Sequence, residues 1–196
     1  MRGRKVSLTL HDGSIYIGDA NNNIPNGKGV MTFSNHDIYD GDWSDGKMDG
    51  CGRYQFFDVE SDKHTASYVG EFKDNQFNGF GERKFMDKSI YKGQWQNGMR
   101  TGNGAMWFSD GSYCFGIWKY DRMIKGIIHL SSGDIYDGEL SDGYFEGYGK
   151  YHWLKTGDFF EGIFKDGKPF TGNKILRNGN IILYKKGVPF EQQNYI

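Results

Sequence analysis

The sequence has little of what several protein classes require. Among its 196 residues there are 3 prolines and 2 cysteines, and the net charge is −1. No apolar run approaches the roughly 18 residues of a membrane-spanning helix, and no apolar segment follows the N-terminal charges as in a signal peptide. Two isolated thiols, Cys51 and Cys114, in a chain without a signal peptide favour a reducing, cytoplasmic location.

The sequence also lacks an excess of charge of one sign and a helical spacing of apolar residues. The 24 basic and 25 acidic side chains nearly cancel, so we expect no nucleic acid as a partner. No stretch spaces its apolar residues with the helical period of about 3.6 residues. The glycine spacings therefore lack the strand-to-helix context of a nucleotide-binding loop.

Residue patterns for catalysis or metal binding are absent as well. The Asp-Gly pairs do not follow the EF-hand spacing. The histidines lack metal-ligand spacing and are spread singly, at His11, His36, His64, His129 and His152. The sequence predicts a non-enzymatic chain with no catalytic residue, no cofactor and no metal site.

Glycine and aromatic residues are abundant instead. The chain has 30 glycines, and aromatic residues make up 17% of it. They recur in one unit, Y-x-G-x-W-x-x-G-x-x-x-G-x-G, which is complete from Tyr39 to Gly52. We predict seven copies, starting near residues 16, 39, 68, 91, 114, 136 and 160. A period of 22 to 24 residues indicates a tandem array of one supersecondary unit.

Three copies depart from the regular spacing. The copy at Tyr39 is followed by a longer step of 29 residues, because a polar insertion lies near Asp58 to Lys63. We predict that this insertion is a hairpin tip. The copies at Cys114 and Phe160 reach their last glycine one residue early, and we interpret this as a shortened turn.

The unit predicts β-hairpins. Alternate residues of a strand face the same side, so Tyr39 and Trp43 share an aromatic face while Asp40 and Asp42 share a polar one. Glycine at Gly41 leaves room for an aromatic ring to cross the bare backbone. Asp-Gly and Asn-Gly pairs then supply the tight turns between strands.

This unit resembles the repeat of the MORN family, Y-E-G-x-W-x-x-G-x-x-x-G-x-G, over nearly the whole chain. We therefore predict an all-β fold, a single elongated, twisted antiparallel sheet of tandem MORN hairpins with about fifteen strands. The predicted boundaries are an N-terminal tail at 1–5, the array with flanking half-strands at 6–184, and a C-terminal tail at 185–196.

The resemblance also implies a function. MORN arrays occur in cytoskeletal, ciliary and membrane-associated assemblies, which favours a protein-interaction scaffold that binds a helix or an extended peptide. We expect partner binding on the aromatic face, through Tyr39, Trp43, Tyr54, Tyr68, Phe72, Tyr91, Trp95, Trp118, Tyr136, Tyr151 and Trp153.

A second patch is predicted on the otherwise polar face. There, apolar residues replace the usual charged ones on three neighbouring strands, at Ala105, Trp107, Phe115, Ile117 and Ile127. This patch would bind a partner, form a homodimer, or be covered by the chain's own tail through Val188, Pro189 and Phe190. We call these five residues the second patch.

Two further functions stay open. One is a peripheral membrane or phosphoinositide-binding protein, which is not favoured because such binding needs clustered basic residues. The C-terminal end is only modestly basic, through Lys165, Lys168, Lys174, Lys185 and Lys186. The other is a bacterial or viral repeat protein that binds a toxin or a host factor.

Overall fold

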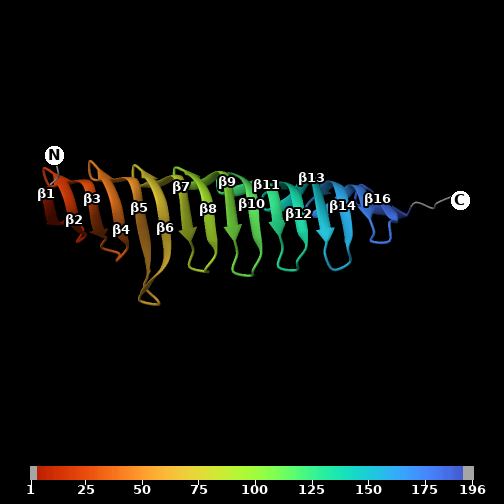
Figure 1. The fold of residues 1–196 in the computed structure, drawn as a ribbon, viewed down its shortest axis with the longest axis horizontal. Helices are drawn as coiled ribbons and strands as arrows, with labels where there is room; N and C mark the ends of the chain where they lie inside the picture. The colour runs from red at the N-terminus through yellow and green to blue at the C-terminus, as the bar shows by residue number, and fades with distance from the viewer. Residues whose placement is uncertain (1–3, 192–196) are drawn as a thin grey trace. The chain divides into compact units, whose positions relative to one another are not determined.

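The computed structural model describes residues 4–191, which form strands and turns and no helix. Seventeen strands lie in this part of the chain (Figure 1). Their bounds are β1 (Arg4–Thr9), β2 (Ile15–Asn21), β3 (Ile24–Thr32), β4 (Ile38–Ser44), β5 (Lys47–Asp58), β6 (Lys63–Lys73), β7 (Gln76–Lys84), β8 (Ile90–Gln96), β9 (Met99–Trp107), β10 (Tyr113–Lys119), β11 (Arg122–His129), β12 (Ile135–Ser141), β13 (Tyr144–Trp153), β14 (Asp158–Lys165), β15 (Lys168–Ile175), β16 (Ile181–Lys185) and β17 (Val188–Glu191).

The chain divides after Thr101 into two compact units. In the first unit, β1 to β7 each pair antiparallel with the next strand along the chain. In the second unit, which begins at Gly102 within β9, the same pairing continues from β9 to β17. The predicted all-β, antiparallel hairpin fold is confirmed. The prediction that the array is a single elongated sheet involves both units together, and it stays a prediction.

Tyrosines at the start of the repeats form the core of each unit. Tyr16, Tyr39, Tyr68, Tyr91 and Tyr136 are all 0% exposed. The Tyr39 ring lies over Gly52, where a Cβ atom would come within 2.4 Å of the ring. Its hydroxyl donates a hydrogen bond to the carbonyl of Asp42 at 2.9 Å. The bare glycine backbone is therefore what lets the ring lie flat on the sheet, as predicted. We call the face that carries these tyrosines the inner face and the opposite one the outer face.

Each repeat turns through two residues. Asp45 and Gly46 connect β4 to β5 with φ of 48° and 80°, the left-handed pair of a type I′ turn. The hairpin from β10 to β11 uses Tyr120 and Asp121, with φ of 49° and 65°. The copy at Cys114 thus has a turn of the usual length, and the predicted shortened turn is wrong.

The copies at Cys114 and Phe160 are one residue shorter because their β-bulge, not their turn, contains one residue fewer. In the copy at Tyr39, Gly41 pairs with Gly52 and Trp43 pairs with Met48, so one residue of β4 opposes three residues of β5. In the copy at Cys114, Gly116 pairs with Gly126 and Trp118 pairs with Met123, so one residue opposes two. The copy at Phe160 has the same narrow bulge.

In the copies at Tyr39 and Tyr68, a carboxylate accompanies the wide bulge. Asp42 accepts a hydrogen bond from the backbone N–H of Cys51 at 2.9 Å, and Glu71 accepts one from Phe80 at 3.0 Å. The narrow bulges have Ile117 and Ile163 at this position. Because isoleucine cannot accept a hydrogen bond, these two copies omit the extra residue that would leave a backbone N–H of the bulge without an acceptor.

The insertion lengthens one hairpin of the first unit. Residues 59–62 form an exposed turn, and the hairpin of β5 and β6 reaches beyond its neighbours (Figure 1). Its base packs on the preceding turn, because the Phe57 ring lies 5.1 Å from His36 and 5.3 Å from His64. The predicted hairpin tip is confirmed.

The array extends beyond both of its predicted ends. β1 already begins at Arg4, and β16 runs through Lys185. Residues 188–191 form β17, which pairs with β16. The described chain therefore has two more strands than the fifteen expected, and tails at 1–5 and 185–196 are wrong where the structure describes them. Residues 1–3 and 192–196 lie outside the described chain.

Candidate protein-interaction surfaces

Most of the predicted aromatic-face residues belong to the core. Their rings are covered by neighbouring repeats in edge-to-face contacts, such as Tyr39 with Phe72 at 4.8 Å. Tryptophans also donate to backbone carbonyls, as Trp43 does to Gly29 at 3.0 Å. The expectation that they offer a free binding surface is corrected for the buried members, which are Tyr39, Trp43, Tyr68, Phe72, Tyr91, Trp95, Trp118 and Tyr136.

Three members of that set stay half-buried: Tyr54 in the first unit, and Tyr151 and Trp153 in the second. The Tyr151 hydroxyl donates to Asp134 at 2.9 Å. Burial, together with this hydrogen bond, raises the pKa of Tyr151 to about 12. Lys174 lies 4.5 Å over the Trp153 ring and 3.1 Å from Asp158. These side chains are held in place by polar partners, and their rings remain reachable.

The second patch is exposed on the outer face of the second unit. Trp107, Phe115 and Ile117 are 44%, 45% and 44% exposed. Phe115 lies between Ala105 on β9 and Ile127 on β11, since it pairs with both. The structure thus brings the predicted patch residues together on three adjacent strands.

The chain's own tail does not cover this patch within the described residues. Val188 and Phe190 are strand residues of β17, and Phe190 pairs with Leu183 of β16. Both are 52% exposed. The alternative of a tail-covered patch is therefore excluded for residues 188–191.

Sequence reasoning missed that the patch continues. Tyr113 pairs with Trp107, and its ring stacks on His129 at 4.3 Å. From there, cross-strand pairs carry a row of side chains over the outer face of the second unit. We call this the outer row, and it consists of Trp107, Tyr113, His129, Ile135, His152, Phe159, Ile175 and Ile181. The alternation along each strand carried the signal, but the register was needed to align it.

Among the described residues of the first unit, no such row occurs. The corresponding outer positions there include Thr9, Thr32, Gln55, Ser67 and Lys84, with isoleucines between them. The next row of that unit carries Asp40 opposite Arg53. An extended apolar and aromatic outer surface is therefore a property of the second unit.

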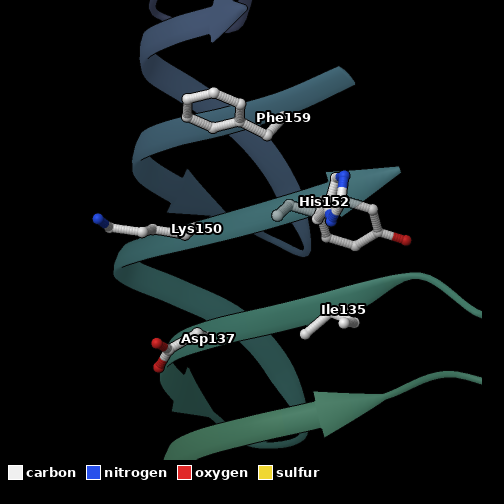
Figure 2. Close-up of a pocket in the computed structure, with 6 residues that line it drawn as sticks. Ile135, Asp137, Lys150, His152 and Phe159 are labelled. Carbon is white, nitrogen blue, oxygen red and sulfur yellow. The ribbon is translucent and has the colours of Figure 1, made fainter. Parts of the chain in front are cut away.

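A shallow depression of about 270 Å³ lies in the middle of the outer row. Ile135, His152 and Phe159 line it from β12, β13 and β14, and Asp137 and Lys150 lie beside them in the next row (Figure 2). The site combines apolar contact area with one acid and one base, a pattern of protein recognition surfaces.

Metal binding, the two cysteines and membrane spans complete the description of candidate sites. Between residues 4 and 191, no group of histidine, cysteine and acidic side chains is placed to hold a metal ion. Cys51 is exposed and Cys114 is buried, as their strand positions predicted, and neither forms a disulfide in the described chain. Within the same residues, no helix is long and apolar enough to cross a membrane.

Several known proteins are similar to this chain. Human alsin is 30% identical over 147 residues, which are 71% of this chain and 9% of alsin. MORN repeat-containing protein 3 from Xenopus laevis is 30% identical over 87 residues, or 44% of this chain and 37% of that protein. The chain thus spans a small part of these relatives. The solved TCP10 domain of Danio rerio CPAP, in complex with a peptide of STIL, is 14% identical with a TM-score of 0.49, covering 93% of this chain and 84% of that one.

The family model named MORN repeat matches residues 16–38, 39–58, 68–90, 91–113 and 136–154. These five matches start at predicted repeat positions and together cover more than half of the chain. The other two predicted copies, at Cys114 and Phe160, are those with the narrow bulge. The chain belongs to the MORN-repeat family.

Proposed function

We propose that this chain is a non-enzymatic protein-interaction module and that its binding surface is the outer face of the second unit. The observation that carries the proposal is the exposure of Trp107, Phe115 and Ile117 on adjacent strands. Large apolar side chains gathered on a surface typify protein interfaces, and tryptophan is the residue most enriched among those that dominate binding energy.

The geometry of the sheet determines which partners fit. The outer row crosses the strands, so a partner segment that follows it meets one side chain about every 4.8 Å. A helix advances about 5.4 Å per turn and an extended peptide places same-side residues about 6.7 Å apart, so either can lie along the row. A scaffold role in a cytoskeletal, ciliary or membrane-associated assembly fits this surface and is the role that the family resemblance implies.

The test is selection of displayed random peptides on the immobilised chain, with the double variant Trp107→Ala, Ile117→Asp as the comparison. We expect peptides that bind the parent and lose at least tenfold in affinity to the variant. Asp40→Ala with Val69→Asp changes the outer face of the first unit and should leave this binding intact. Peptides that bind parent and double variant equally, or no enriched peptide at all, would contradict the proposal.

A further inference from the structure

We propose that the outer face of the second unit pairs with the same face of a second copy of this chain. The two copies pack sheet on sheet, related by a two-fold axis that runs parallel to the strands, between β12 and β13. This inference rests on the proposed function, because it names one partner of the same surface.

The outer row is compatible with such symmetry. A two-fold rotation about this axis lays β12 of one copy over β13 of the other. Each cross-strand row of one copy then lies opposite the same row of the other copy. Ile135 then faces His152 of the second copy, and His129 faces Phe159 of the second copy. Apolar and aromatic side chains therefore meet one another on both sides of the axis, as an isologous interface requires.

Charge complementarity at the axis favours the same arrangement. Asp137 and Lys150 pair across β12 and β13 in the row beside Ile135 and His152 (Figure 2). The rotation places each Asp137 opposite Lys150 of the other copy, so two acid–base contacts form. Lys150 also contacts Glu161 at 3.1 Å, on the next strand. Both Asp137 and Lys150 are exposed in the single chain, so a second copy can reach them.

The available area is enough for a dimer. Six strands around the axis at about 4.8 Å spacing and three rows of side chains give about 600 Å² on each copy. Two copies together bury about 1,200 Å², the lower end of stable protein interfaces. Twisted sheets that pack face to face cross at about −30°, so contact is closest at the axis and weakens toward β9 and β16.

Charge reversal tests the axis directly. Asp137→Lys places lysine opposite Lys150 of the second copy, and Lys150→Glu places glutamate opposite Asp137. Each variant alone should be a monomer in sedimentation equilibrium, while the parent at about 100 µM should show a mass near twice 22.4 kDa. An equimolar mixture of the two variants should restore a dimer, because lysines of one chain then face acids of the other.

The mixing result separates an interface from a folding defect. Repulsion inside each variant chain is the same alone and in the mixture, so only contacts between chains can restore the mass. The matched control is Asp40→Lys with Arg53→Glu, the corresponding pair of the first unit, which should leave the dimer unchanged.

A monomeric parent, a dimer that persists in Asp137→Lys, or a mixture that stays monomeric would each overturn the inference. Peptides selected on a monomeric parent would still support the proposed function, so the two failures are distinguishable.

Discussion

At the scale of the residue, the repeat depends on tyrosines that lie over glycines. The glycine is needed for space at Gly52, where no left-handed backbone is involved and the Tyr39 ring occupies the position of a side chain. At Gly98 the requirement is different, because φ is +78° and nothing lies within 4 Å of a built Cβ atom. The same residue type therefore serves two physical purposes within one repeat family.

We predict that Gly52→Ala costs about 3 kcal/mol or more of unfolding free energy, since the Tyr39 ring cannot move aside in a packed core. Gly98→Ala should cost only about 1 kcal/mol, for its strained backbone. Urea denaturation of the two variants and the parent measures both values. Equal losses would show that the ring over Gly52 adapts easily.

The buried Tyr16 and the half-buried Tyr151 also predict a pH dependence. Burial, and the nearby Asp19 carboxylate, raise the pKa of Tyr16 to about 12, and burial raises that of Tyr151 to a similar value. An unfolded tyrosine titrates near 10. The unfolded chain therefore loses these protons first as pH rises, and folding stability, complete below pH 10, falls between about pH 10 and 12.

Thermal melting at half-unit steps from pH 8 to 11.5 checks this decline. In Tyr151→Phe the decline should be shallower, because one of the contributing hydroxyls is gone. A melting temperature that stays level across this range would contradict the raised pKa of these two tyrosines.

At the scale of the element, the hairpins come in a wide-bulge and a narrow-bulge form. In the wide form around Asp42, the carboxylate accepts the extra N–H, and Gly50 takes φ of +110°. The narrow form around Ile117 has neither feature. One side chain and one inserted residue thus change together, because each is unfavourable without the other.

This coupling is testable in the copy at Cys114. Inserting glycine between Ile124 and Lys125 recreates the wide spacing but leaves the N–H without an acceptor, so we expect a loss of about 1–3 kcal/mol. Adding Ile117→Asp should recover most of it, whereas Ile117→Asp alone should destabilise the parent slightly. Denaturant unfolding of the three variants gives the coupling. If the second change recovers nothing, the carboxylate does not support the bulge.

At the scale of the whole molecule, stability accumulates from neighbour to neighbour along each unit. Fully buried rings lie in the inner strands, such as Tyr68 on β6 and Phe160 on β14. β16 alternates exposed and half-buried residues, with Ile181 exposed. The last strands of the second unit therefore contribute the least buried area.

We predict that amide hydrogens of β16 exchange at least tenfold faster than those of β12 to β14, because end strands open without disturbing the inner ones. Hydrogen–deuterium exchange read by mass spectrometry resolves these segments. Uniform protection from β12 to β16 would instead show that the unit unfolds only as a whole.

The repeat pattern by itself determined the hairpins, the aromatic stripe on one face and the position of the second patch, with Trp107 and Ile117, on the other. These follow from local rules, because strand alternation and two-residue turns act over a few residues. The same rules placed Cys51 outside and Cys114 inside.

Only the tertiary structure decided how neighbouring strands align. It assigned the missing residue of the Cys114 copy to a bulge, extended the array through β17, and buried rings such as Trp43 that the sequence left open to partners. It also joined Trp107 to Phe159 and Ile181 in one outer row. Register is set by contacts between residues far apart in the chain, so no local pattern could determine it. A shift of one residue in the pairing of a strand would move each of its side chains to the opposite face of the sheet.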